Sequence, residues 1–369
     1  MTDEKVGLYI HVPFCIKVCP YCAFYKMTYS KEYADIFLNN LIKEMRLYYN
    51  QYGSINVNTI FFGGGTPNIL PKKMFEALFD AMHRYFNVAS SAEISMEMNP
   101  GVHSLSKLMF FKQLGINRVS IGVQSFKNNV LDDYGRNHTD TDTVQFINDV
   151  KTAGFNNISV DIIFGHPNHN HSDLEFSINK LIEYSFNHVA LYGLTVEKNT
   201  PFHTSGLVIN NDDQADSYNY IQRALSNAGF NQYEVSNFSK PGYESCHNIK
   251  YWTFQPTIGL GAGAHSYFLR HRYSNHNDFK TYTDNLRMVL PVSLANPCDI
   301  SEYLAVRLRY KSPLYFKDIE TLYSVNDLSK LSNNLINLKK SGYVEVRDDS
   351  FNINERGFQL LDEIICHLV

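Results

Sequence analysis

The stretch "HVPFCIKVCPYCAFYK", residues 11–26, places three of the six cysteines of the chain, Cys15, Cys19 and Cys22, within eight positions. Cysteines this close together in a large chain favour metal ligation over a disulfide framework. A cubane iron–sulfur cluster normally takes four thiolates, one for each iron, so the C-x3-C-x2-C spacing leaves one iron without a protein ligand. Catalytic metal sites likewise keep one position open for water or substrate. The spacing therefore predicts an open cluster that can bind a further ligand.

Two other interpretations of these cysteines stay open at this point. A zinc ion completed by His11 or by a remote group also suits thiolate ligands, and closely spaced cysteines can be ordinary core residues. The remaining cysteines, Cys246, Cys298 and Cys366, stand apart from one another in the sequence.

The cysteines follow the first of six short apolar runs, which alternate with longer amphipathic segments as far as residue 235. This alternation is typical of βα units and a parallel sheet. The runs are "GLYIHV" (7–12), "NTIFF" (58–62), "EISMEM" (93–98), "RVSIGV" (118–123), "ISVDIIF" (158–164) and "HVALYGLTV" (188–196). They begin about 25 to 50 residues apart, which leaves room for a crossover helix between strands. We therefore predict an α/β fold with a partial (β/α)6 barrel over residues 1–235.

The segments between the runs carry helix start signals. After Ser30, apolar residues recur at spacings of three and four, as expected for one buried helix face: Ala34, Phe37, Leu41, Met45 and Tyr48. Later helices are predicted to follow proline or capping residues, namely Pro71, Ser104, Asp140, Ser172 and Asp213.

The residue composition of the sequence changes beyond residue 235. Residues 236–298 contain the stretches "SKPGYESCHNIKYW" (239–252) and "IGLGAGAHSY" (258–267), whose Gly, Asn and aromatic content predicts a loop region that covers the mouth of the barrel. Residues 299–369 follow the order helix, hairpin turning at Asp348–Ser350, helix, which predicts a small winged-helix-like domain.

Charge and hydropathy argue against two classes of partner. The chain of 369 residues has a net charge of -4, and residues 311–369 carry seven Lys or Arg against nine Asp or Glu. The basic face that phosphates require is therefore missing, and we expect no nucleic acid. No run of eighteen apolar residues occurs, and the N-terminus lacks a basic start followed by an apolar segment. We expect neither a membrane span nor a signal peptide, and hence a cytoplasmic protein.

Polar residues and glycines gather at the ends of the predicted strands. In a parallel barrel the carboxyl ends of the strands meet at one rim, so residues far apart in the sequence can line one cavity. Glycines in "FFGGGTP" also allow the backbone to approach a ligand closely, although a tight turn alone would explain them. The strand-end residues are Gly63–Thr66, Glu97, Gln124, Asp161 and Tyr192, and "YGRNH" adds Arg136. One shared site is therefore predicted.

Two histidine-containing stretches have both a structural and a metal-binding interpretation. "GHPNHNH" (165–171) carries His166, His169 and His171, but no cluster of hard ligands surrounds them in the sequence, so a solvated loop is expected. "CHNIKYW" (246–252) contains His247 beside Cys246 and the single tryptophan. A neutral imidazole there can be an axial iron ligand, whereas the residues alone favour a hydrogen-bonded structural histidine.

The cysteine spacing followed by a GGGTP turn resembles the radical S-adenosylmethionine (radical SAM) superfamily, in which the open iron binds the amino and carboxylate groups of S-adenosylmethionine. More narrowly, "YIHVPFC", "CPYC", "FFGGGTP", "IGVQSF" and "YGRNH" resemble the oxygen-independent coproporphyrinogen III oxidase group. Within that group, "QYEVSNFSKPGYESCHNIKYW" and "GLGAGAHSY" are similar to the heme chaperones. The resemblance covers essentially the whole chain.

The resemblance implies specific ligands and partners. It assigns a [4Fe-4S] cluster to Cys15, Cys19 and Cys22, with an electron donor to reduce it, and a heme-ligand role to His247 in the H-N-x-x-Y-W motif. The residues that match positions around S-adenosylmethionine are Tyr9, Tyr21, Gly64, Gly65, Thr66, Glu97, Gln124, Arg136 and Asp161. The implied function is a heme chaperone that binds heme and passes it to an acceptor protein, which can be membrane-bound.

Three departures from the family patterns bear on the function. The oxidase carries another cysteine where this chain has Phe24, and a substantial extension before the cluster where only fourteen residues precede Cys15. Both departures disfavour the alternative function, oxidative decarboxylation of coproporphyrinogen III in porphyrin biosynthesis. The heme chaperones usually show a G-L-P-x-Q-T-like loop where this chain has "GHPNHNH".

Overall fold

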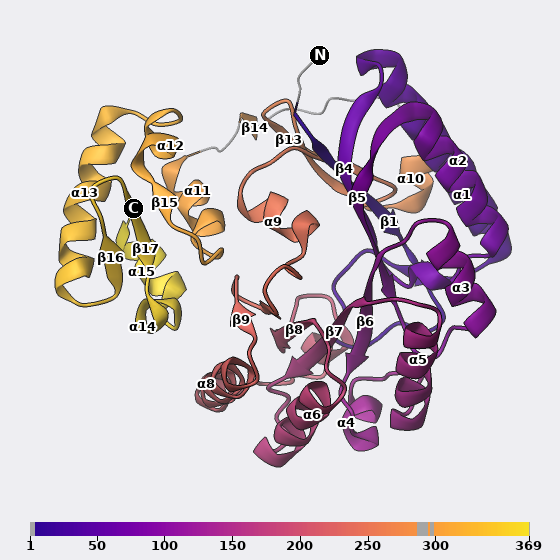
Figure 1. Cartoon of the computed structure of the whole chain (residues 1–369), viewed down its shortest axis with the longest axis horizontal. Coiled ribbons are helices and arrows are strands. Elements are labelled where there is room, and N and C mark those ends of the chain that lie inside the picture. The colour runs from indigo at the N-terminus through magenta and orange to yellow at the C-terminus, as the bar shows by residue number, and fades with distance from the viewer. Residues whose placement is uncertain (1–3, 286–293, 296–298, 369) are drawn as a thin grey trace.

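The computed structural model describes residues 4–285, 294–295 and 299–368 (Figure 1). Its centre is a sheet with the strand order β14-β13-β12-β11-β1-β4-β5-β6-β7-β8-β10-β9. All six predicted runs are neighbouring parallel strands of this sheet. They are β1 (Val6–Val12), β4 (Ile55–Gly64), β5 (Phe86–Met98), β6 (Arg118–Gln124), β7 (Asn157–Phe164) and β8 (His188–Gly193). The βα prediction for this part of the chain is confirmed.

Helices connect these strands and lie along the outer side of the sheet (Figure 1). The main ones are α1 (Lys31–Tyr52), α2 (Lys72–Tyr85), α3 (Leu105–Gln113), α5 (Asp140–Thr152), α6 (His171–Glu183) and α8 (Asn211–Asn227). Ser30 caps α1 as predicted, and Ala34, Phe37, Leu41, Met45 and Tyr48 are its buried apolar residues. The caps of α5, α6 and α8 are Thr139, Asn170 and Asn210, one to three residues before the expected positions.

The shorter elements of this part complete the connections around the sheet. They are β2 (Phe14–Cys15), β3 (Met27–Thr28), the 3-10 helix η1 (Pro67–Ile69), α4 (Asn128–Asp133), α7 (Pro201–Thr204), β9 (Asn231–Gln232), β10 (Asn237–Ser239), α10 (Phe279–Asp284) and β14 (Leu294–Ala295). Within the described part of the chain, every helix is too short or too polar to cross a membrane.

The region expected to be loops contains further regular structure. It holds α9 (Cys246–Trp252), β11 (Thr257–Leu260), β12 (His265–Phe268) and β13 (His271–Ser274). β11 pairs in parallel with β1, on the side opposite β4, so this region extends the sheet. Gly259 within β11 and Gly261 directly after it led to the prediction of a loop for this strand. Residues 286–293 and 296–298, among them Cys298, lie outside the described residues.

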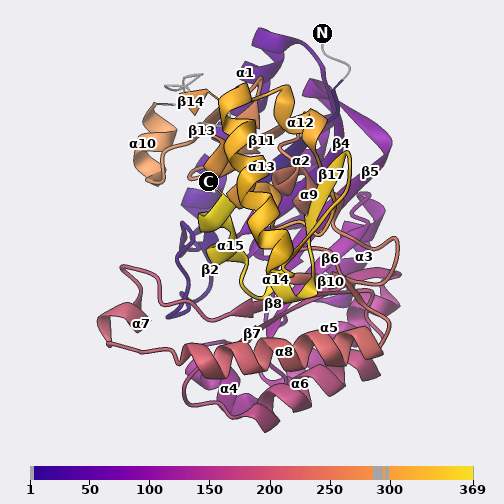
Figure 2. The same cartoon turned by 90° about the vertical axis from the view of Figure 1, so that its left-hand side faces the viewer.

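The C-terminal elements form a separate layer beside α9 and β9 (Figures 1 and 2). They are α11 (Ile300–Arg307), β15 (Leu314–Tyr315), α12 (Phe316–Glu320), α13 (Val325–Lys340), β16 (Val344–Val346), β17 (Ser350–Ile353), α14 (Glu355–Phe358) and α15 (Leu361–Leu368). The strands pair in the order β15-β17-β16, and the layer has its own apolar core. The order helix, hairpin, helix is as predicted.

A buried carboxylate joins α1 to the added strands. Glu44 accepts hydrogen bonds from the Gly261 amide (2.9 Å), from Asn275 Nδ2 (2.7 Å) and from the Tyr282 hydroxyl (2.7 Å). Burial raises the pKa of Glu44, whereas these three donors lower it. The buried carboxylate therefore satisfies three polar groups, of which the Gly261 amide and the Tyr282 hydroxyl are buried and Asn275 is half-buried, and it holds residues 257–282 against the first helix.

Replacing Glu44 by alanine is expected to lower the free energy of unfolding by about 3 kcal/mol, because three donors lose their acceptor inside the protein. Urea denaturation measures this loss. Asp35→Ala, at an exposed position of the same helix, is the control and should change stability by less than about 0.5 kcal/mol. Equal effects of the two substitutions would contradict a central role for Glu44.

Candidate functional site

A cavity of about 330 Å³ lies at the carboxyl ends of the parallel strands. The three clustered cysteines line it, together with eight of the nine residues predicted to surround S-adenosylmethionine: Tyr21, Gly64, Gly65, Thr66, Glu97, Gln124, Arg136 and Asp161. Tyr9 does not; it lies on the wall of a smaller adjoining chamber. The strand-end residues thus converge as the parallel topology requires.

The cysteine loop is anchored at both ends by backbone pairing. β2 pairs in parallel with β3, which brings Phe14 beside Met27 and Cys15 beside Thr28. Inside the loop, the Cys22 amide donates to the Cys19 carbonyl at 3.2 Å. Three thiols are therefore held on a short loop whose entry and exit are fixed by the strands.

The positions of these thiols distinguish between the metal interpretations. A single zinc ion with Zn–S bonds of about 2.3 Å needs sulfur atoms about 3.8 Å apart. Among the described residues, the three cysteines do not form a set whose ligand atoms all lie within 4.8 Å of one another. Both nitrogens of His11 are also engaged, with the Tyr9 hydroxyl at 3.0 Å and the Tyr25 carbonyl at 2.8 Å. The arrangement fits ligands of separate irons better than one closed zinc site.

The glycine turn after β4 is bonded directly to the cysteine segment. The Gly65 amide donates to the Val12 carbonyl (2.8 Å), and the Thr66 amide donates to the Phe14 carbonyl (2.7 Å). A Cβ atom on Gly65 would lie 2.6 Å from the Phe14 oxygen, so a larger residue does not fit. The Thr66 hydroxyl in turn points at Cys15 Sγ, 3.8 Å away.

One half-buried arginine links the cysteines to two strand ends. Arg136 Nη1 lies 3.6 Å from Cys19 Sγ and 3.3 Å from the Tyr21 hydroxyl, and Nη2 donates to the Gly122 carbonyl and to Asn99 Oδ1. The side-chain amide of Asn99 (Nδ2) in turn donates to the Thr66 hydroxyl at 2.8 Å. The positive charge of Arg136 favours thiolates in its neighbourhood.

Gln124 reaches the cavity because its backbone is in the left-handed region, with φ of 66°. The pairing of β6 with β7 shifts register between Ile121 and Gln124, at the same place. A non-glycine residue in this conformation costs free energy that the surrounding structure must offset, and such residues gather at functional sites.

Two carboxylates, Glu97 and Asp161, face the cavity. Burial raises the pKa of Glu97 to about 8, and the negative charge of Asp161 adds to the effect, whereas the hydrogen bond from the Gly64 amide opposes it. Burial also raises the pKa of Asp161 to about 6, against the hydrogen bond from Ser120. Two carboxylates with raised pKa values in one cavity favour a positively charged ligand, which would stabilise their ionised forms.

The adjoining chamber has a volume of about 270 Å³ and shares Phe24, Glu97, Asp161 and Tyr192 with the main cavity. His247 lies on its wall, fully buried. Its Nδ1 is 2.9 Å from the Thr59 hydroxyl, and its Nε2 is 2.9 Å from the Tyr251 hydroxyl. Burial, helped by the charges of Lys250 and Arg118, lowers the pKa of His247 to about 3, so the ring is neutral.

Glu93 on β5 positions the helix that carries His247. Its carboxylate accepts hydrogen bonds from the amides of Cys246 (3.1 Å) and His247 (3.0 Å), the first residues of α9. A negative charge at a helix N-terminus is stabilising, so this contact holds α9 against the sheet.

Two residues of the site were missed by the sequence analysis. Asn99 follows Glu97 by two residues in "EMNPG", and the strand-end argument applied to that stretch would have found it. Arg118 starts β6 rather than ending it, so the same argument passes over it, yet its side chain lines the inner chamber. The chamber therefore extends into the barrel from the rim.

The expectation of a solvated loop without hard ligands at residues 165–171 is wrong for two of its histidines. His166 is buried, and His169 Nε2 lies 3.1 Å from the Asp133 carboxylate. Asp133 comes from α4, 33 residues before His166, so local sequence could not place it there.

Comparisons with known proteins identify the class and then the family. A profile of the Radical SAM superfamily matches residues 9–181, which carry most of the cavity. Heme chaperone HemW of Lactococcus lactis subsp. lactis is 32% identical, over 99% of this chain and 100% of its own length. Heme chaperone HemW of Bacillus subtilis is 37% identical, over 75% of this chain and 74% of its own. The chain therefore belongs to the HemW family of radical SAM proteins.

The fold is also that of a solved relative. The structure of coproporphyrinogen III oxidase (HemN) from Escherichia coli, described as a radical SAM enzyme, superposes with a TM-score of 0.86 at 21% identity, over 99% of this chain and 90% of that one. At this identity the likeness concerns the fold, and it confirms the predicted α/β radical SAM architecture. Membership of the superfamily implies a [4Fe-4S] cluster and S-adenosylmethionine as cofactors.

Glu97→Gln is expected to change how stability depends on pH when S-adenosylmethionine is absent. In the unfolded chain the pKa of glutamate is about 4.3, so the raised pKa of Glu97 gives stability that is lost as pH rises through about 8. Relative to the wild type, the variant should gain of the order of 2 kcal/mol between pH 6 and pH 9, after allowance for water in the cavity. Urea midpoints at both pH values measure the difference.

Glu76→Gln, at an exposed position of α2, is the matched control and should follow the wild-type pH profile. Parallel profiles for Glu97→Gln and the wild type would show that Glu97 is ionised throughout this range.

Proposed function

We propose that this protein is a heme chaperone, which binds heme and transfers it to an acceptor protein. The observation that carries the proposal is the 32% identity with Heme chaperone HemW of Lactococcus lactis over practically the full length of both chains. The placement of His247 beside the cysteine cavity supports it, because an imidazole is a common axial ligand of heme iron. The acceptor can be soluble or bound to a membrane.

In this proposal the rim residues hold the cofactors. Cys15, Cys19 and Cys22 would hold the [4Fe-4S] cluster, which supplies one open iron and, once reduced by an electron donor, an electron. Glu97 and Asp161 would pair with the positive charges of S-adenosylmethionine, and Gln124 and Arg136 would orient it. The strands keep these side chains in fixed positions, which is part of the contribution a protein makes to cofactor chemistry.

We also propose a division of labour along the chain. Residues 1–235 would carry the cofactors, residues 236–298 would close the site through His247, and residues 299–369 would form a small domain that contacts the acceptor. The separate apolar core of the C-terminal layer supports its being a small domain. The cytoplasm, where thiols stay reduced, suits free cysteines and a cluster.

Heme ligation by His247 requires a local rearrangement. The ring is fully buried, and Nε2 is bonded to the Tyr251 hydroxyl at 2.9 Å. Tyr251 must therefore release Nε2, and α9 must move, before iron can bind that nitrogen. The amide bonds to Glu93 and the Thr59 contact with Nδ1 would then keep the ring oriented while its other nitrogen is free.

Substitutions on α9 test this role in a heme titration followed by absorbance. His247→Ala is expected to abolish the shifted Soret band or to weaken heme binding by more than about tenfold, because the axial ligand is lost. Tyr251→Phe, which removes the competing hydroxyl and keeps the ring, is expected to bind heme more tightly and faster.

Cys246→Ala is the control on the same helix, because Cys246 is exposed and its thiol is also a potential iron ligand. Its spectrum should match that of the wild type. If Cys246→Ala lost the shifted Soret band while His247→Ala kept it, Cys246 would be the heme ligand, and the proposed role of His247 would be wrong.

The alternative function is oxidation of coproporphyrinogen III, which the motifs that resemble the oxidase group suggest. In the described structure Phe24, which takes the place of a cysteine in the family pattern of the oxidase, is 68% exposed and lines both cavities. A bulky apolar side chain there narrows the space for a porphyrinogen beside the cofactors.

An anaerobic assay with reconstituted cluster, S-adenosylmethionine, reductant and coproporphyrinogen III separates the two functions. We expect no protoporphyrinogen above a no-protein control, and transfer of heme to an apo-acceptor in a parallel assay. Turnover to protoporphyrinogen at rates typical of enzymes, about 1 per second or faster, would replace the chaperone by the oxidase.

A further inference from the structure

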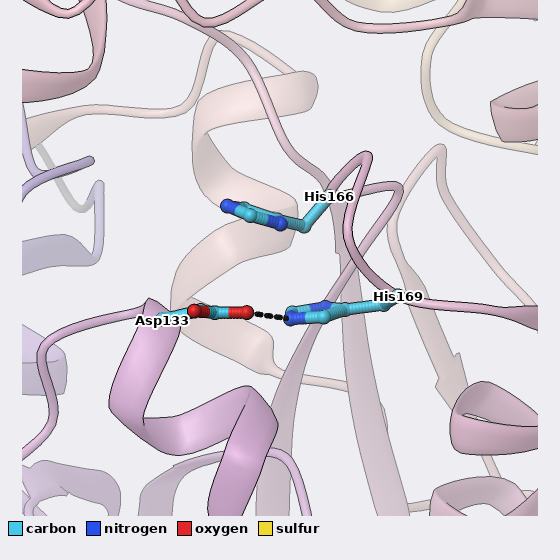
Figure 3. A group of neighbouring side chains, drawn as sticks. All are labelled: Asp133, His166 and His169. Carbon is cyan, nitrogen blue, oxygen red and sulfur yellow. Dashed lines mark hydrogen bonds and ion pairs between the residues drawn. The ribbon is translucent and has the colours of Figure 1, made fainter.

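Two histidines and one aspartate converge outside the cysteine cavity (Figure 3). Asp133 is the last residue of α4, and His166 and His169 lie in the loop between β7 and α6. One ligand atom from each residue lies within 4.8 Å of the other two, and these three form the one such set of His, Cys, Asp or Glu among the described residues. The carboxylate of Asp133 faces His169 Nε2 at 3.1 Å.

The surrounding residues hold this triplet in place. The rings of His166 and His169 stack with centroids 4.5 Å apart, and the His169 amide donates to the His166 carbonyl at 3.0 Å. The ring of Tyr134 makes T-shaped contacts with both imidazoles, with centroid distances of 5.6 and 5.3 Å. His166 is 4% exposed, and the side chain of His169 is 9% exposed. The three ligand groups are thus held close together, and the two stacked rings must tilt toward one another for both to ligate one ion.

A hydrogen bond or ion pair between His169 and Asp133 does not account for the whole arrangement. It leaves unexplained why a second imidazole, that of His166, is buried directly against the first. Two neutral imidazoles and a carboxylate are the ligand set of many divalent transition-metal sites, whereas calcium and magnesium take oxygen ligands.

We propose that Asp133, His166 and His169 bind a divalent transition-metal ion of the zinc class. The ion would take one nitrogen from each histidine and one oxygen from Asp133, and water or another small ligand would complete a tetrahedral shell. His166 and His169 also line a cavity of about 590 Å³ between β7, α6 and α8, from which that fourth ligand can enter. Ligation through Nδ1 of His166 would give up the hydrogen bond that this atom accepts from the Asn168 amide at 3.2 Å, whereas ligation through Nε2 would keep it.

The position of the ion suggests what it stabilises. It would join the end of α4 to the loop after β7, and Asp133 lies three residues before Arg136, which contacts Cys19 and Tyr21. The ring of Tyr134 packs against Tyr21 at 5.6 Å on one side and against the two imidazoles on the other. The metal would therefore brace the wall of the cysteine cavity from outside, independently of heme.

The test uses the full-length chain with its cluster reconstituted and without a histidine tag. Anaerobic titration with Co²⁺ should give one bound ion per chain, with weak d–d absorption and no thiolate charge-transfer band, and one equivalent of Zn²⁺ should displace it. The missing thiolate band distinguishes this site from cobalt bound to cysteines.

Three substitutions and one control locate the ion. His166→Ala, His169→Ala and Asp133→Asn should each weaken Co²⁺ binding by more than about tenfold. Asp133→Asn keeps the size of an exposed side chain, so its fold is preserved even if the histidine variants are unstable. His171→Ala, at the first residue of α6 and outside the triplet, should bind as the wild type does. The proposal would be overturned if Co²⁺ did not bind, or bound only with a thiolate charge-transfer band. It would also be overturned if His171→Ala and Asp133→Asn weakened Co²⁺ binding equally. In either case the triplet would be a hydrogen-bonded anchor of the loop.

Discussion

The pairing of β1 with β4 is the constraint on which the site depends. Because these strands run in parallel and in continuous register from Gly7 to Val12, the segment that leads to Cys15 and the glycine turn after β4 leave the sheet side by side. The amides of Gly65 and Thr66 then bond to the carbonyls of Val12 and Phe14. A one-residue slip in this register would turn the side chains of one strand to the opposite face and separate the turn from the cysteine loop.

The charged groups around this contact are not evenly paired. Arg136 lies against Cys19 and Tyr21, whereas Glu97 and Asp161 stand across the cavity and repel one another. Ionising two neighbouring carboxylates that have little contact with water costs free energy. The pKa values of both carboxylates are raised for this reason. A cationic ligand would lower the free-energy cost of ionising the two carboxylates. The cavity therefore prefers a positively charged ligand, and neither carboxylate needs to contact a metal for this.

Sequence reasoning reached the features that arise from chain direction and short spacing. The six parallel strands, the cap at Ser30 and the convergence of Thr66, Glu97 and Asp161 all follow from periodicity and from the rule that parallel strands end at one rim. It did not reach contacts made by tertiary packing. β11 was hidden by its glycines, Glu93 contacts α9 across 153 residues of chain, and Asp133 meets His169 only because α4 packs under the loop.

The packing around His247 links the fold to transfer of a ligand. A chaperone must release what it binds, so a ligand residue that has an internal partner in the free state is an advantage: the hydroxyl of Tyr251 competes with iron for Nε2 and lowers the net affinity. The carboxylate of Glu93 opposes complete displacement of α9, because two amides would lose their acceptor. In the proposed function, His247 would alternate between its bond to Tyr251 and ligation of heme iron, and small changes in α9 would shift that balance. That arrangement suits transient heme binding better than a permanent prosthetic group, for which no competing hydroxyl would be needed.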